Sequence, residues 1–158
     1  SGLAVGVDEA AHRGVVEAGG TAIAVLGNGI DTVYPRANRG LARSIIETGG
    51  CVLSEYGPGT SPRRYHFPAR NRIIAGCARS TVVVEAPERS GALITADFAL
   101  EEGRDLFVHR AGLHGRNSGG LIALARDGAE AVGSARDVLE RWNTTESKTG
   151  MQRALFPG

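Results

Sequence analysis

The stretch Thr81-Val82-Val83-Val84-Glu85-Ala86, with the segment Ser90-Gly91-Ala92-Leu93-Ile94-Thr95 that follows it, gives the clearest indication of the fold. Its first part is apolar and rich in β-branched residues, a composition that favours a buried β-strand. A helical pattern of apolar residues then runs from Leu93 to about Glu102, and Ser90-Gly91 forms a small turn between the two. A strand followed by a short turn and a helix is typical of α/β proteins with a parallel sheet.

The same alternation continues along the rest of the chain. Further strands are predicted at residues 21–26, 51–53, 106–108 and 129–132. Helical patterns lie between them at residues 8–18, 38–49, from Pro68 through a stripe of Ile73, Ile74 and Cys77, at 121–124 and around Val138-Leu139. Asp8 and Asn38 are expected to cap their helices, and the stripe is expected to face the core. We therefore predict an α/β fold with a mostly parallel sheet and helices on both faces.

Composition narrows the range of functions. The chain of 158 residues has the length of one domain, and its 18 basic and 17 acidic residues nearly cancel. Bulk charge therefore points to no class of partner, and no apolar run approaches the ~20 residues that span a bilayer. Cys51 and Cys77 lie among small apolar residues, which indicates buried thiols in a reducing, cytoplasmic compartment. No cysteine or histidine pair has zinc-ligand spacing, and we expect neither a metal nor a cofactor.

One segment is strongly basic although the whole chain is nearly neutral. Residues 56–84 contain no Asp or Glu. They contain Arg63, Arg64, Arg70, Arg72, Arg79 and His66, and the arginines are interleaved with Tyr65 and Phe67. Arginines neutralise phosphates and aromatic rings stack on unpaired bases, so this pattern favours single-stranded nucleic acid. A solvated loop with Phe67 in the core remains the alternative.

Several turns also have the composition of ligand-binding loops. Ser90-Gly91 and Ser1-Gly2 are small, hydroxyl-bearing turns, and such turns at the carboxyl ends of parallel strands often hold phosphates. Gly27-Asn28-Gly29 lacks the third glycine of a dinucleotide fingerprint, so we interpret it as a tight turn. Glu55 and Glu85 end two predicted strands, and together they could support acid–base chemistry on a nucleotide.

The ordered motifs resemble those of the DprA/Smf family. The matching residues are Ser1-Gly2-Leu3-Ala4 with Gly6, Asp8 and His12; Ala24-Val25-Leu26-Gly27 with Gly29, Asp31, Tyr34, Pro35 and Asn38; Ser54-Glu55; Phe67-Pro68-Ala69-Arg70-Asn71-Arg72-Ile73-Ile74-Ala75-Gly76; Val83-Val84-Glu85-Ala86; Ser90-Gly91; and Thr95-Ala96. The resemblance covers about Ser1 to Trp142. It implies a Rossmann-like core at residues 1–142, followed by a polar and flexible tail at 143–158.

The resemblance also implies a function. Members of this family bind and protect single-stranded DNA, dimerise, and help to load a RecA-type recombinase during natural transformation, and they are not known as enzymes. In this chain the implied DNA contacts are Arg64, Phe67, Arg70, Asn71 and Arg72, together with the turns Ser1-Gly2 and Ser90-Gly91, and the basic segment adds Arg63 to these candidates. Phe67 would stack on bases, and the arginines would contact phosphates.

The chain also departs from the family pattern. The opening strand of the family, with its Gly-Ser-Arg turn, would precede Ser1, so we expect an N-terminally incomplete domain. His109-Arg110-Ala111-Gly112 stands where the family usually has a proline-glycine, and no C-terminal winged helix is visible. Two other functions remain open. One is a nucleotide-binding or nucleotide-hydrolysing enzyme, and the other is an assembly role in which residues 121–139 form a dimer surface.

Overall fold

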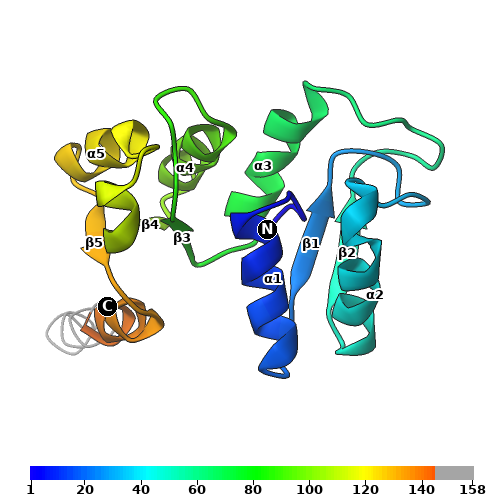
Figure 1. Cartoon of the computed structure of the whole chain (residues 1–158), viewed down its shortest axis with the longest axis horizontal. Helices are drawn as coiled ribbons and strands as arrows, with labels where there is room; N and C mark the ends of the chain where they lie inside the picture. The colour runs from blue at the N-terminus through cyan, green and yellow to red at the C-terminus, as the bar shows by residue number, and fades with distance from the viewer. Residues whose placement is uncertain (145–158) are drawn as a thin grey trace, which may run out of the picture.

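Strands and helices alternate along the chain in the computed structural model, which describes residues 1–144 (Figure 1). The elements are α1 (Val7–Glu17), β1 (Ile23–Leu26), the 3-10 helix η1 (Arg36–Asn38), α2 (Arg39–Glu47), β2 (Cys51–Ser54), α3 (His66–Gly76), β3 (Ser80–Val83), α4 (Gly91–Glu101), β4 (Asp105–His109), the 3-10 helix η2 (Arg110–His114), α5 (Gly119–Arg126) and β5 (Glu130–Val132). Residues 135–144 are also helical. The predicted α/β fold is therefore confirmed.

All pairs of neighbouring strands are parallel, but they form two sheets. β1 pairs with β2 in the first sheet, and the second has the order β3-β4-β5. The predicted parallel pairing is confirmed, and within the described residues the strands divide into two sheets because β1 and β3 do not pair. The strand order reverses between these two strands, which is where α/β proteins commonly bind their ligands.

Two groups occupy the edge of β1 that faces away from β2. The Ser1 nitrogen donates to the Ile23 carbonyl at 3.1 Å, and the Val25 nitrogen donates to the Ser1 carbonyl at 2.9 Å. This alternation is the bonding pattern of a parallel pair, so Ser1 extends the first sheet. The guanidinium of Arg70 donates to the Val25 carbonyl. The edge of β1 is thus hydrogen-bonded without any contribution from β3.

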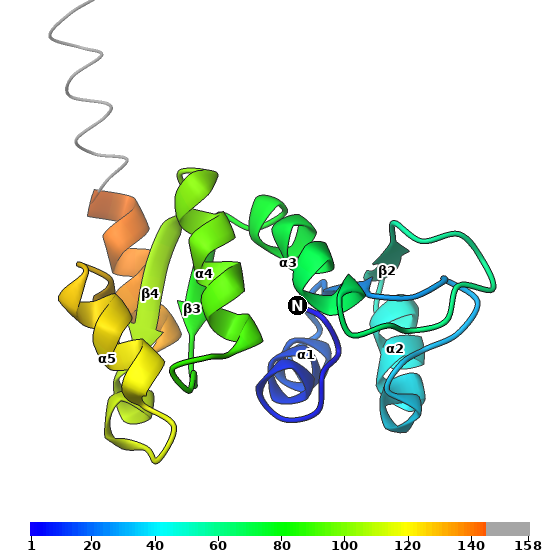
Figure 2. The same cartoon turned by 90° about the horizontal axis from the view of Figure 1, so that it is seen from above.

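Each sheet has its own hydrophobic core, and α3 connects them. The first core is built around Leu3, Leu26 and Ile45, and the second around Val108 and Leu121. Figure 2 shows α3 lying between the two halves of the molecule, where it contacts both β1 and α4. The amino end of α3 is consequently held beside both sheets.

Several local expectations need correction. The Asp8 carboxylate does not cap α1 but accepts from the Gly2 nitrogen at 2.9 Å, because the turn before the helix folds back onto it. Asn38 does precede α2, yet its side chain makes no capping hydrogen bond, and its Nδ2 donates to the Leu3 carbonyl. Cys77 is exposed rather than buried. Within residues 1–144, no helix combines the length and hydropathy required to cross a membrane.

α3 differs most from its predicted form. It begins at His66, two residues before Pro68, so Phe67 lies in its first turn. Its buried residues are His66, Arg70, Asn71 and Ala75 instead of the apolar stripe. The spacing of apolar residues did not predict the buried face of α3, because that face forms hydrogen bonds to polar groups in both halves of the molecule.

The buried histidine of α1 predicts a pH dependence of stability. His12 is 3% exposed. Burial, with a smaller contribution from the nearby Ser1 ammonium, lowers the pKa of His12 to about 4. The unfolded chain takes up this proton near pH 6.5 while the folded chain resists it, so the free energy of unfolding decreases as pH falls through this window. We expect a loss of about 2 kcal/mol between pH 7 and pH 5.

Urea unfolding at both pH values measures this effect. The His12→Gln variant cannot take up the proton, so its stability should change much less over the same range. An equal loss in the variant and the parent chain would show that His12 is not responsible.

Candidate nucleic-acid interface

The start of α3 is anchored to the end of β1. Nδ1 of the buried His66 is 3.0 Å from the carbonyl oxygen of Gly27, the residue that follows β1. The Tyr56 ring stacks on His66 with 4.0 Å between ring centroids. These contacts fix the chain direction at the point where the basic loop at residues 57–64 enters the helix.

Phe67 lies at the surface in a defined position. Its ring is half-buried and packs so closely on Gly27 that a Cβ at that glycine would lie 2.8 Å from Cδ1 of the ring. On another side it contacts Tyr34, with 5.6 Å between ring centroids and 37° between planes. Phe67 is therefore neither sealed in the core nor fully free, and the tight approach explains why position 27 is a glycine.

The basic loop before α3 presents unpaired cations. Arg63 and Arg64 are exposed, and neither forms an ion pair or a side-chain hydrogen bond with any residue from 1 to 144. Tyr65 follows them and is 63% exposed. Two unpaired guanidinium groups beside an exposed ring match the requirements for contacting phosphates and bases.

The other two arginines are engaged in contacts with the protein itself. Arg70 is 5% exposed, and its guanidinium donates to the carbonyl oxygens of Gly2 and Val25 and to Oδ1 of Asn71. Desolvation by burial lowers the pKa of Arg70. Arg72 forms an ion pair with Glu55. In this arrangement the Arg70 guanidinium is buried and the Arg72 guanidinium is paired with Glu55, and the phosphate contacts predicted for both arginines stay predictions.

Adjacent residues of α3 hold the two expected phosphate-binding turns. Arg70 donates to the Gly2 carbonyl at 3.2 Å, and Nδ2 of Asn71 donates to the Gly91 carbonyl at 3.2 Å. Ser90 stands directly before α4, and within residues 1–144 its buried hydroxyl has no hydrogen-bond partner. The turns Ser1-Gly2 and Ser90-Gly91 thus flank α3 at the place where the strand order reverses.

The two carboxylates considered for acid–base chemistry are bound to different groups. Glu55 pairs with Arg72 of α3, whereas Glu85 accepts a hydrogen bond from Asn117 at 3.3 Å. Neither contact brings one carboxylate to the other. This geometry does not favour the enzymatic alternative.

Sequence reasoning did not identify Tyr34 as part of the site. Its ring is 48% exposed and extends the aromatic surface of Phe67. Tyr34 lies 33 residues before Phe67 in the sequence, so only the folded arrangement shows their contact. The available signal in the sequence was an aromatic residue followed by Pro35 and Arg36.

Comparison with known proteins shows which family the chain resembles. Residues 1–143 match the family described as DNA recombination-mediator protein A. DNA processing protein DprA of Streptococcus pneumoniae is 50% identical over 139 residues, which are 88% of this chain and 49% of that protein. Protein Smf of Escherichia coli is 44% identical over 140 residues, covering 89% of this chain and 37% of that protein. The chain therefore spans half or less of the length of these two relatives.

Two solved structures share the fold. The X-ray structure of DprA from Streptococcus pneumoniae superimposes with a TM-score of 0.79 and 49% identity, covering 88% of this chain and 49% of that one. DprA of Helicobacter pylori, whose structure is described as revealing a single-stranded DNA binding mode, gives a TM-score of 0.79 at 26% identity, covering 91% of this chain and 65% of that one. The chain belongs to the DNA recombination-mediator protein A family, the family of the DprA and Smf proteins.

Proposed function

We infer that this chain is the single-stranded DNA-binding part of a DNA processing protein, a Rossmann-like core at residues 1–142. The observation that carries the proposal is the arrangement at the start of α3. Unpaired Arg63 and Arg64, exposed Tyr65 and half-buried Phe67 lie side by side along the chain, next to the two turns held by α3. Cations and ring faces without a competing carboxylate suit a strand whose bases are unpaired.

The nature of the contacts favours single strands over duplex. A duplex keeps its base faces stacked, so exposed rings add little to duplex affinity, whereas each base of a single strand can contribute ~1–3 kcal/mol by stacking. The arginines contribute an electrostatic part of the affinity that weakens with salt. For single strands, log affinity falls against log salt concentration with a slope of about −0.7 per neutralised phosphate.

Fluorescence anisotropy with a labelled oligo-dT strand tests this function. We expect the 158-residue chain to bind the single strand at least tenfold more tightly than a duplex of equal length, with affinity that falls as salt increases. Two neutralised phosphates would give a slope of log affinity against log salt concentration of about −1.4 or steeper. Equal affinity for duplex, or affinity insensitive to salt, would contradict the proposal.

The wider role follows from the family. We propose that the full protein acts in the cytoplasm in competence and recombination, protects incoming single strands, dimerises and helps to load a RecA-type recombinase. We propose binding without catalysis, and release of base from nucleoside monophosphates by the purified chain would contradict this. The flexible tail proposed for residues 143–158 lies, from residue 145 on, outside the described residues.

A further inference from the structure

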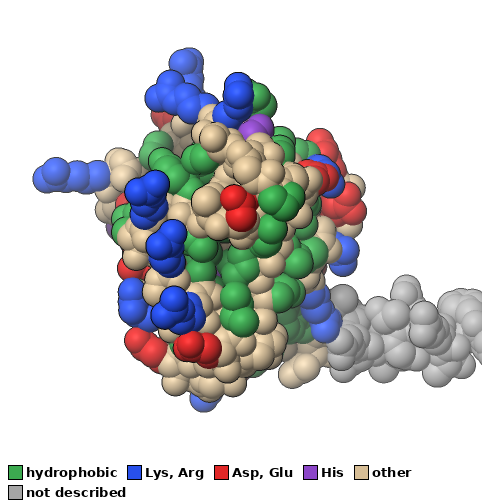
Figure 3. All heavy atoms as spheres, turned by 90° about the vertical axis from the view of Figure 1, so that its right-hand side faces the viewer, with side chains coloured by type: hydrophobic (Ala, Val, Ile, Leu, Met, Phe, Trp, Pro, Cys, Tyr) green, Lys and Arg blue, Asp and Glu red, His purple; other side chains and the backbone are tan. Residues whose placement is uncertain are grey.

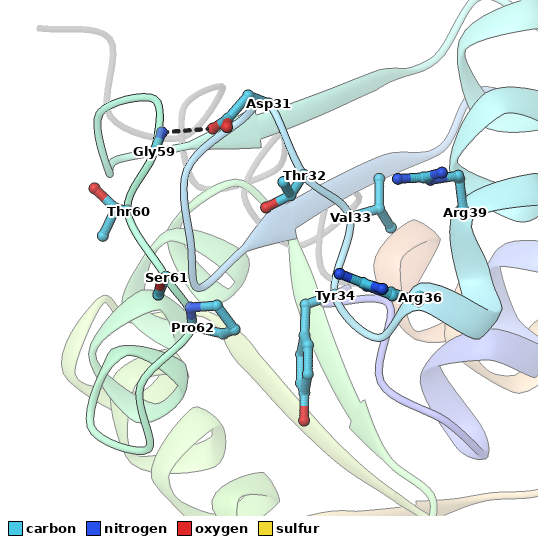
Figure 4. A pocket seen from close by; sticks show the side chains of 10 residues that line it. All are labelled: Asp31, Thr32, Val33, Tyr34, Arg36, Arg39, Gly59, Thr60, Ser61 and Pro62. Carbon is cyan, nitrogen blue, oxygen red and sulfur yellow. Dashed lines mark hydrogen bonds between the residues drawn. The ribbon is translucent and has the colours of Figure 1, made fainter.

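A pocket of about 380 Å³ lies next to the surface formed by Tyr34 and Phe67. Its walls are the loop at residues 31–36, the start of α2 and the loop at residues 59–62 (Figure 4). The two loops are tied together, because the Gly29 nitrogen donates to the Thr60 carbonyl at 2.8 Å and the Gly59 nitrogen donates to Oδ1 of Asp31 at 2.8 Å. One main-chain bond and one bond to the Asp31 carboxylate therefore hold the two sides of the pocket together.

Two arginines give the pocket its charge. Arg36 of η1 and Arg39, the first residue of α2, line it, and both side chains extend toward the loop at residues 31–34 (Figure 4). Within residues 1–144 neither has an ion-pair or side-chain hydrogen-bond partner. The lining also contains the carboxylate of Asp31, which accepts a hydrogen bond from the Gly59 nitrogen, so two basic side chains and one acidic side chain leave the lining with a net charge of +1.

The position of these arginines is unfavourable for the helix itself. The first turn of α2 holds no acidic residue, and Arg39 is its first residue. The positive end of a helix dipole favours acidic side chains and disfavours cations. The positive end of the α2 dipole and the two guanidinium groups, which have no side-chain partner within residues 1–144, together suit an anionic ligand.

Tyr34 connects the pocket to the interface proposed above. Its ring lines the pocket and also contacts Phe67. A surface thus runs from Arg64 past Phe67 and Tyr34 to Arg36, and Figure 3 shows basic side chains gathered at the top and along one side of this end of the molecule. A ligand bound at Phe67 would need only to continue along this surface to reach the pocket.

We propose that the pocket is a second subsite for the same polynucleotide, in which Arg36 and Arg39 bind phosphodiesters of a strand segment adjacent to the one at Phe67. This inference rests on the proposed DNA binding. The second subsite can be occupied only by a strand long enough to reach both positions. Its test therefore depends on strand length, whereas the test of DNA binding itself does not. A short strand occupies the Phe67 position alone, whereas a longer strand gains the additional contacts.

The test compares oligo-dT strands of 5 and 20 nucleotides by fluorescence anisotropy over a range of salt concentrations. For the double variant Arg36→Ala/Arg39→Ala we expect about tenfold weaker binding of the 20-mer and a change of less than twofold for the 5-mer. The slope of log affinity against log salt for the 20-mer should become less negative by about 1.4, at 0.7 per lost phosphate contact.

The matched control is Arg126→Ala/Arg136→Ala. It removes the same charge from exposed positions in α5 and in the helix at residues 135–144, at the opposite end of the molecule (Figure 1). A control that equals the pocket variant in all measurements would overturn the subsite, while proposed DNA binding would stand. Failure of the parent chain to bind either strand would overturn the function itself, and the subsite with it.

A third arm distinguishes a strand from a free nucleotide. Calorimetric titration with thymidine monophosphate should give no saturable binding to the parent chain at micromolar concentrations. Saturable binding that the pocket variant loses, without any change in the 20-mer slope, would show that the pocket serves mononucleotides and would overturn the polynucleotide assignment.

Discussion

The double variant Arg64→Ala/Phe67→Leu is expected to bind single-stranded oligo-dT at least about 60-fold more weakly than the parent chain. Removal of a charge-assisted bond to phosphate costs roughly 1.5–3 kcal/mol, and loss of one stacking surface costs ~1–3 kcal/mol. Even the lower sum approaches two factors of ten, at ~1.4 kcal/mol for each factor. Anisotropy with the 5-mer measures the effect at the Phe67 position alone.

The substitutions are chosen so that the fold survives. Arg64 is exposed and has no side-chain partner in residues 1–144, so its removal leaves nothing unpaired. Leucine keeps an apolar side chain against Gly27 and Tyr34 while removing the ring face, and we expect a change in the free energy of unfolding of about 1 kcal/mol or less. A folded double variant with affinity within twofold of the parent would show that neither the Arg64 guanidinium nor the Phe67 ring contributes to DNA binding.

The sequence predicted the elements better than it predicted how their ends are built. Each predicted strand appears close to its expected position, because runs such as Val82-Val83 are apolar and β-branched. The strand at residues 81–86 ends earlier, at Val83. Asp8 and Asn38 were assigned caps from local propensity, yet both side chains bond to the turn at residues 1–4, which packs against them only in the folded chain.

In the candidate site, too, local features could be predicted from the sequence and contacts between distant residues could not. Arg63, Arg64 and the aromatic residues could be proposed from composition, since exposed cations beside rings form a pattern within one short segment. The engagement of Arg72 with Glu55 and the contact of Tyr34 with Phe67 join residues distant in sequence. No local pattern encodes such pairs, so the sequence could not separate the arginines without a partner in residues 1–144 from those that bond to other residues of the chain.

Arg70 is the clearest example of an arginine that bonds to the protein itself. The Arg70→Ala variant is expected to lose about 3 kcal/mol or more of its free energy of unfolding. The change leaves two carbonyl oxygens, of Gly2 and Val25, without their donors and creates a buried cavity. An unpaired buried polar group costs roughly 1–3 kcal/mol, and the cavity adds to this. Urea unfolding followed by circular dichroism measures the difference, and a value within 1 kcal/mol of the parent would contradict a structural role.

The salt dependence of DNA binding then decides between the two roles considered for this arginine. Arg70→Met fills the same volume without a charge, and it is measured at a temperature where it remains folded. If Arg70 only holds the Ser1-Gly2 turn and the edge of β1, the slope of log affinity against log salt stays unchanged, even where affinity itself decreases. If its guanidinium contacts a phosphate, the slope becomes less negative by about 0.7. We expect the unchanged slope, because a guanidinium that is 5% exposed and donates to two main-chain carbonyls cannot reach a strand at the surface without leaving both unpaired.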